Sequence, residues 1–359
     1  MSDAANRSRR DNEAEPAGPR SSPLVAPAAG FLKRSPVVWP VAGIVLLVIV
    51  NLVQNPGFLR VTVLDGHLFG APIDILNQGS RVMIVALGMT LVIATGGIDL
   101  SVGSIVAIAG AVAAMLIGEG GYSLPVIVGA AVAGGALAGL VNGVLVAFAG
   151  VQPIIATLIL LYAGRGVAQL LTHSEVRLIK HPGFEFLGNG FFAMLPFAAL
   201  IAGGLYLATY VALRQTAGRL FIEAVGDNPI ASRFAGVATA RVRCLVYVFC
   251  GACAGLAGVL VASNIRAADS LRAGENLELD AIFAVVVGGT ALTGGRFLLL
   301  GSLVGVLLLQ TLTHTMYNVG VAPAVATVPK ALLILLVCVL QSEATRRWLR
   351  GLLARKAAA

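Results

Sequence analysis

The chain has 359 residues, of which 58% are hydrophobic and only 12% are charged. An average soluble domain carries about 25% charged residues, and a soluble protein this apolar would expose large apolar patches. The composition therefore excludes an ordinary soluble enzyme, a disordered regulator and a collagen-like fibre. We interpret the net charge of +8 as the cationic excess of cytoplasmic membrane loops rather than as a nucleic-acid-binding surface.

The N-terminal residues 1–36 are polar and rich in Arg, Pro, Ala and Ser, which predicts a disordered cytoplasmic tail. The first apolar run begins only near Val37, and no cleavage-like site follows it. It therefore predicts an uncleaved membrane span over about Val37–Val53 rather than a signal peptide. The next segment, Gly57–Asn77, is mixed in character, and we expect it to form a loop with an interfacial piece.

Nine further apolar segments predict an all-α, polytopic integral membrane protein with about ten transmembrane helices. They lie at about 80–96, 101–118, 125–148, 152–172, 192–213, 242–263, 278–293, 297–317 and 324–341. A permease domain at 37–341 would then precede a basic cytoplasmic tail at 342–359. A broken or re-entrant helix is the alternative at the short turns Gly96–Val102 and Gly288–Arg296.

The distribution of basic residues predicts the orientation of these spans. If the N-terminus is cytoplasmic, 17 of the 25 Lys and Arg residues fall in inside segments and 5 in outside loops. Basic residues concentrate on the cytoplasmic side of membrane proteins. We therefore expect both termini to be cytoplasmic, and 214–243 to be the largest internal cytoplasmic loop.

Closely spaced glycines and the cysteines both indicate helix packing. The glycines repeat every four residues at Gly135, Gly139 and Gly143, at Gly251 and Gly255, and at Gly301 and Gly305. This spacing favours contact between helices within one chain, with a dimer contact as the alternative. Cys250 and Cys253 form a C-x-x-C string inside an apolar run, so we expect packing and neither a redox nor a metal site.

One polar string, Gly96–Gly103, interrupts the apolar run that continues to Ile117. Gly96 and Gly97 permit a tight turn, and Gly103 follows where the next helix begins. Asp99 or Ser101 is expected to cap that helix, and a direct role of Asp99 in substrate binding or coupling is the alternative.

Two pairs of similar strings suggest an internal duplication. Residues 96–103 and 288–295 both fit G-G-x-x-L-[ST]-x-G and lie 192 residues apart. Residues 150–157 and 320–327 are similar at a distance of 170. Transporters are often built from duplicated halves, but the unequal offsets leave the symmetry open.

Several polar residues fall at membrane depth, where each needs a partner or a wet cavity. The candidates for a translocation path are Asn142, Gln152, Thr157, Arg165 and Gln169. Interhelical structural bonding is the alternative for each, and Arg165 needs an anion, carbonyls or water. Lys330 is expected to bond carbonyls that Pro329 leaves free.

The energy source must lie outside this chain if transport is ATP-driven. None of the four lysines follows a glycine, so the chain lacks the G-x-x-x-x-G-K-[ST] phosphate loop. The loop 214–243 predicts two short helices, split at 226–229 and capped by Asp227 or Asn228. Ile230, Phe234 and Val237 share one face of the second helix, which could dock into another protein or lie on the membrane surface.

The string Leu87–Gly103 resembles the signature of the ribose-, xylose- and arabinose-type sugar permeases of bacterial ABC importers. Glu223–Gly226 resembles the segment of that family that couples to the ATPase. Residues 66–78, 152–172 and 277–297 resemble the galactofuranose branch most closely. The resemblance covers about 37–341.

This resemblance implies a permease subunit that forms a path for a monosaccharide and is not an enzyme. The partners implied are an ATPase with two nucleotide-binding domains, a second permease subunit and a periplasmic sugar-binding protein, in the bacterial inner membrane. No cofactor, metal or nucleic acid is implied. The coupling residues would be Glu223, Ala224, Gly226, Asn228 and Gly236.

Two other functions are compatible with the residues alone. An ion-coupled secondary transporter of a small polar solute would need ionisable groups in its path, and Asp99, Arg165 and Lys330 are candidates. A scaffold or sensor subunit would explain the packing glycines but not the polar breaks.

Overall fold

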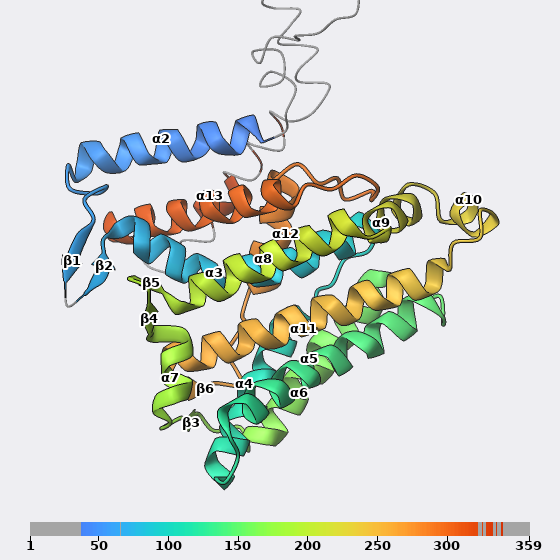
Figure 1. Ribbon diagram of the computed structural model, residues 1–359, viewed down its shortest axis with the longest axis horizontal. Helices are drawn as coiled ribbons and strands as arrows, with labels where there is room; N and C mark the ends of the chain where they lie inside the picture. The colour runs from blue at the N-terminus through green and yellow to red at the C-terminus, as the bar shows by residue number, and fades with distance from the viewer. Residues whose placement is uncertain are drawn as a thin grey trace, which may run out of the picture. The chain divides into compact units, whose positions relative to one another are not determined.

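Helices make up most of the chain in the computed structural model (Figure 1). The structure describes residues 37–64, 66–321, 325, 328–332, 335 and 339, all of which belong to one compact unit. Both predicted tails and most of the predicted last span, 324–341, lie outside the described residues. The same applies to Cys338 and to much of the string 320–327.

Seven of the described helices are long and apolar enough to cross a membrane, which confirms a mostly helical, polytopic membrane protein. They are α3 Ala71–Ala94, α4 Val102–Glu119, α5 Leu124–Ala147, α6 Pro153–Thr172, α8 Phe197–Gln215, α11 Thr239–Ile265 and α13 Leu299–Asn318. The other helices are α2 Val38–Gln54, α7 Pro182–Asn189, α9 Gly218–Asp227, α10 Pro229–Phe234 and α12 Leu277–Val287.

Two predicted boundaries are wrong. The predicted loop over 57–77 instead contains a hairpin and the start of α3 at Ala71, where Pro72 occupies the first turn and needs no hydrogen-bond donor. The span expected at 278–293 ends as a helix at Val287. Gly288 and Gly289 follow, and non-helical backbone leads to Leu299, because four glycines in 288–295 permit backbone shapes that disfavour a helix.

Three short antiparallel strand pairs join the connections at one end of the helical bundle. They are β1 Thr62–Leu64 with β2 His67–Phe69, β3 Arg177–Leu178 with β6 Ala267–Ala268, and β4 Phe191–Phe192 with β5 Leu195–Pro196. The first pair lies between α2 and α3, and the third lies between α7 and α8. The second pair joins the chain that follows α6 to the chain that follows α11. The short helices α9 and α10 instead join α8 to α11 at the opposite end (Figure 1).

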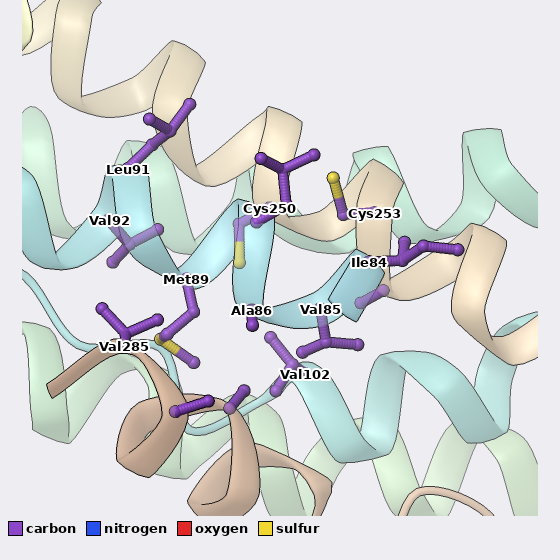
Figure 2. Close-up of a cluster of buried hydrophobic side chains, with 14 of the residues drawn as sticks. Ile84, Val85, Ala86, Met89, Leu91, Val92, Val102, Cys250, Cys253 and Val285 are labelled. Atoms are coloured by element: carbon purple, nitrogen blue, oxygen red, sulfur yellow. The ribbon is translucent and has the colours of Figure 1, made fainter. Parts of the chain in front are cut away.

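Helix α3 forms the centre of the core. It contacts α8, α9, α11, α12 and α13, and its residues from Val82 to Ala94 are buried. Figure 2 shows Met89 of α3 beside Val285 of α12, and Ile84 of α3 near Cys253 of α11. A helix that is apolar on all sides is expected to be surrounded by protein.

A seam of glycines joins α5 to α11, which lie side by side (Figure 1). A Cβ atom on Gly139 would meet the Tyr247 carbonyl and lie 3.1 Å from the Gly251 Cα. Gly135 contacts Gly251 and Gly255 in the same way. The predicted packing within one chain is therefore confirmed. Cys250 and Cys253 are buried free thiols in this region, as the packing interpretation predicts.

Candidate functional site

Three segments that are distant in the sequence meet at the end of the bundle that carries α9. The Gly295 N–H donates to the Ala94 carbonyl at 2.9 Å, which joins the α12–α13 connection to the end of α3. Gly226 of α9 lies against both, since a Cβ there would meet the Ala94 carbonyl and the Gly295 nitrogen. Gly294 lies against Gly96. The two similar glycine strings therefore contact each other and the predicted coupling loop.

The predicted coupling loop folds as two helices, and the cap is Asn228. Its side-chain oxygen accepts the N–H groups of Ile230 at 3.1 Å and Ala231 at 2.9 Å. Both the split at 226–229 and a cap at this point are confirmed. The Ser232 hydroxyl donates to the Ala224 carbonyl at 2.8 Å, which holds α10 against α9.

The two helices of this loop differ in exposure. Ile222 and Val225 of α9 are buried inside the subunit. Ile230 and Phe234 of α10 are 70% and 89% exposed, so none of the described residues of this subunit covers the apolar face of α10. Gly236 follows α10 with a φ of 87°, a left-handed conformation that glycine adopts without strain.

Glu223 lies on the side of α9 that faces α8 and the start of α13. Its carboxylate forms an ion pair with Arg219 at 3.0 Å, and the Arg219 guanidinium lies over the Phe297 ring at 5.6 Å. These three residues line a cavity of about 500 Å³, together with the end of α8 and residues 298–300. The cavity is a hollow between α8, α9 and the residues that precede and begin α13.

Asp99 shapes the break between α3 and α4. Its Oδ1 atom accepts the Ser101 N–H at 3.0 Å and the Ser101 hydroxyl at 2.6 Å. Ser101 is itself the N-cap residue of α4, and its side chain makes no capping bond. Asp99 therefore closes the turn before the helix and does not bond the free N–H groups of the first turn, as a conventional cap would.

Asn142 of α5 completes this buried network. Its amide nitrogen donates to the Ser101 hydroxyl at 2.8 Å and lies 3.4 Å from Asp99 Oδ1. Asp99, Ser101 and Asn142 are all fully buried. This arrangement places Asn142 in interhelical bonding, which was the structural alternative for that residue.

Gly97 occupies a tight position against α11. A Cβ atom there would lie 2.6 Å from the Tyr247 hydroxyl, which donates to the Ile98 carbonyl at 3.3 Å. Tyr247 and Gly97 also line a cavity of about 260 Å³. Its other lining residues are Thr95, Gly96, Val146, Gly150, Val151, Gln152, Pro153 and Arg243.

The structure does not bring the five predicted path residues together. Gln152 lies at the exposed start of α6 and lines that cavity. Thr157 is buried and donates to the Pro153 carbonyl at 2.9 Å. Arg165 donates to the carbonyls of Ala273 at 2.7 Å and Ser270 at 3.2 Å, so carbonyls are its partners. Gln169 is half-buried near the far end of α6.

Two carboxylates that the sequence analysis did not single out lie at the start of α12. Asp280 forms an ion pair with Lys330 at 2.9 Å, so the prediction that Lys330 bonds carbonyls is wrong. Glu278 lies against Gly103 at the start of α4, and its Oε2 atom is buried without a hydrogen bond. The sequence did contain a signal for these two residues. Two carboxylates at the beginning of an apolar run are expected to lie at membrane depth, where a charge needs a partner.

Comparison with known proteins decides the family. Residues 71–339 match the family model described as the permease component of the branched-chain amino acid transport system. The chain belongs to this permease family. As a permease component it is not itself an ATPase, and the expected resemblance to ABC importer permeases is confirmed.

Relatives of this permease include several that are named for sugars. It is 46% identical to the galactofuranose transporter permease protein YtfT of Escherichia coli K12, over 88% of this chain and 94% of that protein. The fructose import permease protein FruF of Bifidobacterium longum is 36% identical, over 87% and 90%. The ribose import permease protein RbsC of Escherichia coli K12 is 37% identical, over 84% and 92%. No solved structure matches the chain.

Proposed function

We propose that this permease forms the translocation path of an ATP-driven, binding-protein-dependent importer of a neutral monosaccharide. The observation that carries the proposal is the 46% identity to a galactofuranose permease along 94% of that protein's length. A galactofuranose-like sugar, or another pentose or hexose, is the proposed substrate. The fructose and ribose permeases among the relatives support the same class.

The proposed assembly is a pair of permease subunits with an ATPase that carries two nucleotide-binding domains and a periplasmic sugar-binding protein. It would lie in a bacterial inner membrane, with about ten spans and both termini cytoplasmic. The span order has structural support, because the end of α3, Gly226 of α9 and the connection at Gly294–Gly295 meet at one end. The connections predicted to lie outside pair their strands at the other end.

The proposed coupling role of the loop 214–243 rests on its contacts. Gly226 seats α9 on the end of α3 and on the α12–α13 connection, while α10 leaves Ile230 and Phe234 uncovered. An ATPase groove that covers those two side chains would therefore act on α3 through α9. Glu223, Ala224, Asn228 and Gly236 would hold the loop in the shape that the groove recognises.

The proposed path has support at its cytoplasmic end. Gln152 and the Gly96–Gly97 turn line the same cavity of about 260 Å³, which offers an amide and backbone groups to a polyhydroxylated solute. Asn142 would join α5 to the start of α4, and Arg165 would hold the α11–α12 connection against α6, while Thr157 bonds within α6. Gln169 would lie farther along α6.

Uptake into reconstituted vesicles tests the proposal. The permease, its ATPase and its binding protein are reconstituted, and labelled galactose, ribose and fructose are offered with and without ATP. We expect uptake only with ATP and binding protein, and none when the phosphate-loop lysine of the ATPase is replaced. Uptake driven by an ion gradient alone would contradict the proposal in favour of a secondary transporter.

A branched-chain amino acid is the second candidate substrate, because the description of the matching family names that class. The same vesicles therefore receive labelled leucine. Leucine uptake without sugar uptake would overturn the sugar assignment while leaving the ATP-driven importer in place.

A further inference from the structure

The connection between α11 and α12 begins at the outer end of α6. We call residues 269–276 the descending segment. The Thr172 hydroxyl, on the last residue of α6, donates to the Ser270 hydroxyl at 3.0 Å. The Arg165 guanidinium bonds the carbonyls of Ser270 and Ala273 and so fixes the segment to α6. This part of the segment is therefore held in a defined place.

The same segment continues down to the middle of the bundle. Gly274 contacts Gly103 at the start of α4, and the neighbouring Ser104 hydroxyl donates to the Leu160 carbonyl of α6 at 3.1 Å. Leu160 and Thr172 are separated by about 18 Å along the helix, at 1.5 Å per residue. Non-helical backbone thus reaches the depth at which α4 and α12 begin.

The descending segment is exposed on one side and carries charge there. Leu271 is 58% exposed, and Arg272, Glu275 and Asn276 are also exposed. Charged side chains at membrane depth face partners or water, and irregular backbone there is either buried in protein or lines a wet cavity. Neither feature fits a surface that faces lipid.

We infer that the descending segment lines the translocation path, with Glu275 and Asn276 in contact with the sugar. This inference rests on the proposed function and extends it to named residues. A carboxylate accepts hydrogen bonds from sugar hydroxyls, and an amide both donates and accepts, so together they suit a neutral polyhydroxylated ligand. In this assignment the path offers the sugar a fixed charge as well as an amide group.

Cysteine accessibility tests this assignment. Asn276→Cys is introduced into a permease that lacks the four native cysteines, and its reaction with a membrane-impermeant methanethiosulfonate reagent is timed in the assembled importer. We expect reaction in the nucleotide-free state, a rate that changes several-fold when the ATPase is trapped with vanadate, and slower reaction in the presence of sugar and binding protein.

Two matched variants give the reference rates. Phe192→Cys, exposed on the outer strand β4, should react at a rate that nucleotide does not change. Leu170→Cys, 77% exposed on α6, should not react if that face meets lipid. An unreactive Asn276→Cys in every state, or one that behaves like Phe192→Cys, would overturn the assignment.

Transport by Glu275 variants provides a second measurement. Glu275→Gln and Glu275→Ala should lower sugar uptake several-fold without changing the amount of permease in the membrane. Unchanged uptake in both would also overturn the assignment. Sugar uptake by the cysteine-free parent is measured first, so that failure of the proposed function shows as a parent that transports no sugar.

Discussion

Helices α9 and α10 follow each other in the same loop, and both carry apolar residues at helical spacing. The apolar residues Ile222 and Val225 of α9 are buried within the subunit, whereas Ile230 and Phe234 of α10 are among its most exposed apolar side chains. Burying a side chain of this size is worth about 1.5–3 kcal/mol, so α9 is stabilised by its own subunit and α10 is not. The difference places α9 in the permease body and, under the proposed coupling role, leaves the apolar side chains of α10 for a partner.

The largest effect is expected at the contact that seats α9. In Gly226→Leu, the new side chain would collide with the Ala94 carbonyl and the Gly295 nitrogen, so α9 cannot remain in place. ATP-dependent uptake should fall by about tenfold or more, since overpacking of this kind costs more than 1 kcal/mol. Uptake and membrane content are measured together, with Gly204→Leu on the open face of α8 as the control. Equal transport by both variants would remove Gly226 from the coupling route.

We expect the exposed face of α10 to contribute to binding of the ATPase and not to the stability of the permease. Phe234→Ala removes an 89% exposed aromatic ring, so the thermal stability of the isolated permease should not change. Loss of an interface anchor typically costs about 2 kcal/mol, so ATPase binding should weaken about 30-fold. Titration of the ATPase against vesicles measures this, and Phe192→Ala at the other end is the control. Normal binding by Phe234→Ala would favour the interpretation that α10 lies on the membrane surface.

The break beneath α9 should tolerate less change than an open helix face. In Gly97→Leu the side chain meets the Tyr247 hydroxyl and Val92, whereas nothing lies within 4 Å of a Cβ on Gly129. We expect Gly97→Leu to reduce transport or assembly by about tenfold and Gly129→Leu to have little effect. Membrane content and uptake distinguish assembly from transport. Equal tolerance at both sites would mean that the break only links two helices.

The smallest effect is expected at the cap between the two helices. Asn228→Ala removes two hydrogen bonds to the first turn of α10, and such caps contribute about 1 kcal/mol. Amide hydrogen exchange over residues 230–234 should become about fivefold faster, while exchange in α9 stays the same. Asn228→Asp retains the acceptor and should restore slow exchange. Unchanged exchange in Asn228→Ala would show that Ser232 alone holds α10.

The sequence predicted those parts of the fold that depend only on residues close together in the chain. Apolar runs located the seven long helices, and glycines at a spacing of four located the α5–α11 seam. A cap before Pro229 was predicted at Asp227 or Asn228, and the structure places it at Asn228. A break at 288–296 was open only as an alternative to a span over 278–293, because the contact of Gly288 with Gly301 depends on how two helices pack.

The site was less predictable because its bonds join distant parts of the chain. Lys330 and Asp280 are fifty residues apart, and Arg165 bonds carbonyls more than a hundred residues away. A sequence shows that each charge needs a partner but not which partner it has. The proposed roles of the coupling residues and the path residues remain predictions until the variants are measured.

Helix α11 gives the permease a mechanical link between its two ends. Its 27 residues form a continuous helix of about 40 Å, and the glycine seam locks it to α5. Four residues separate it from α10, and three residues separate it from the descending segment. If a partner displaces α10, we therefore expect α11 to move as one rigid helix. The displacement would then reach the opposite end of the bundle without bending within α11. The pivots of the transport cycle would then lie at the two short linkers, 235–238 and 266–268, and not within the bundle.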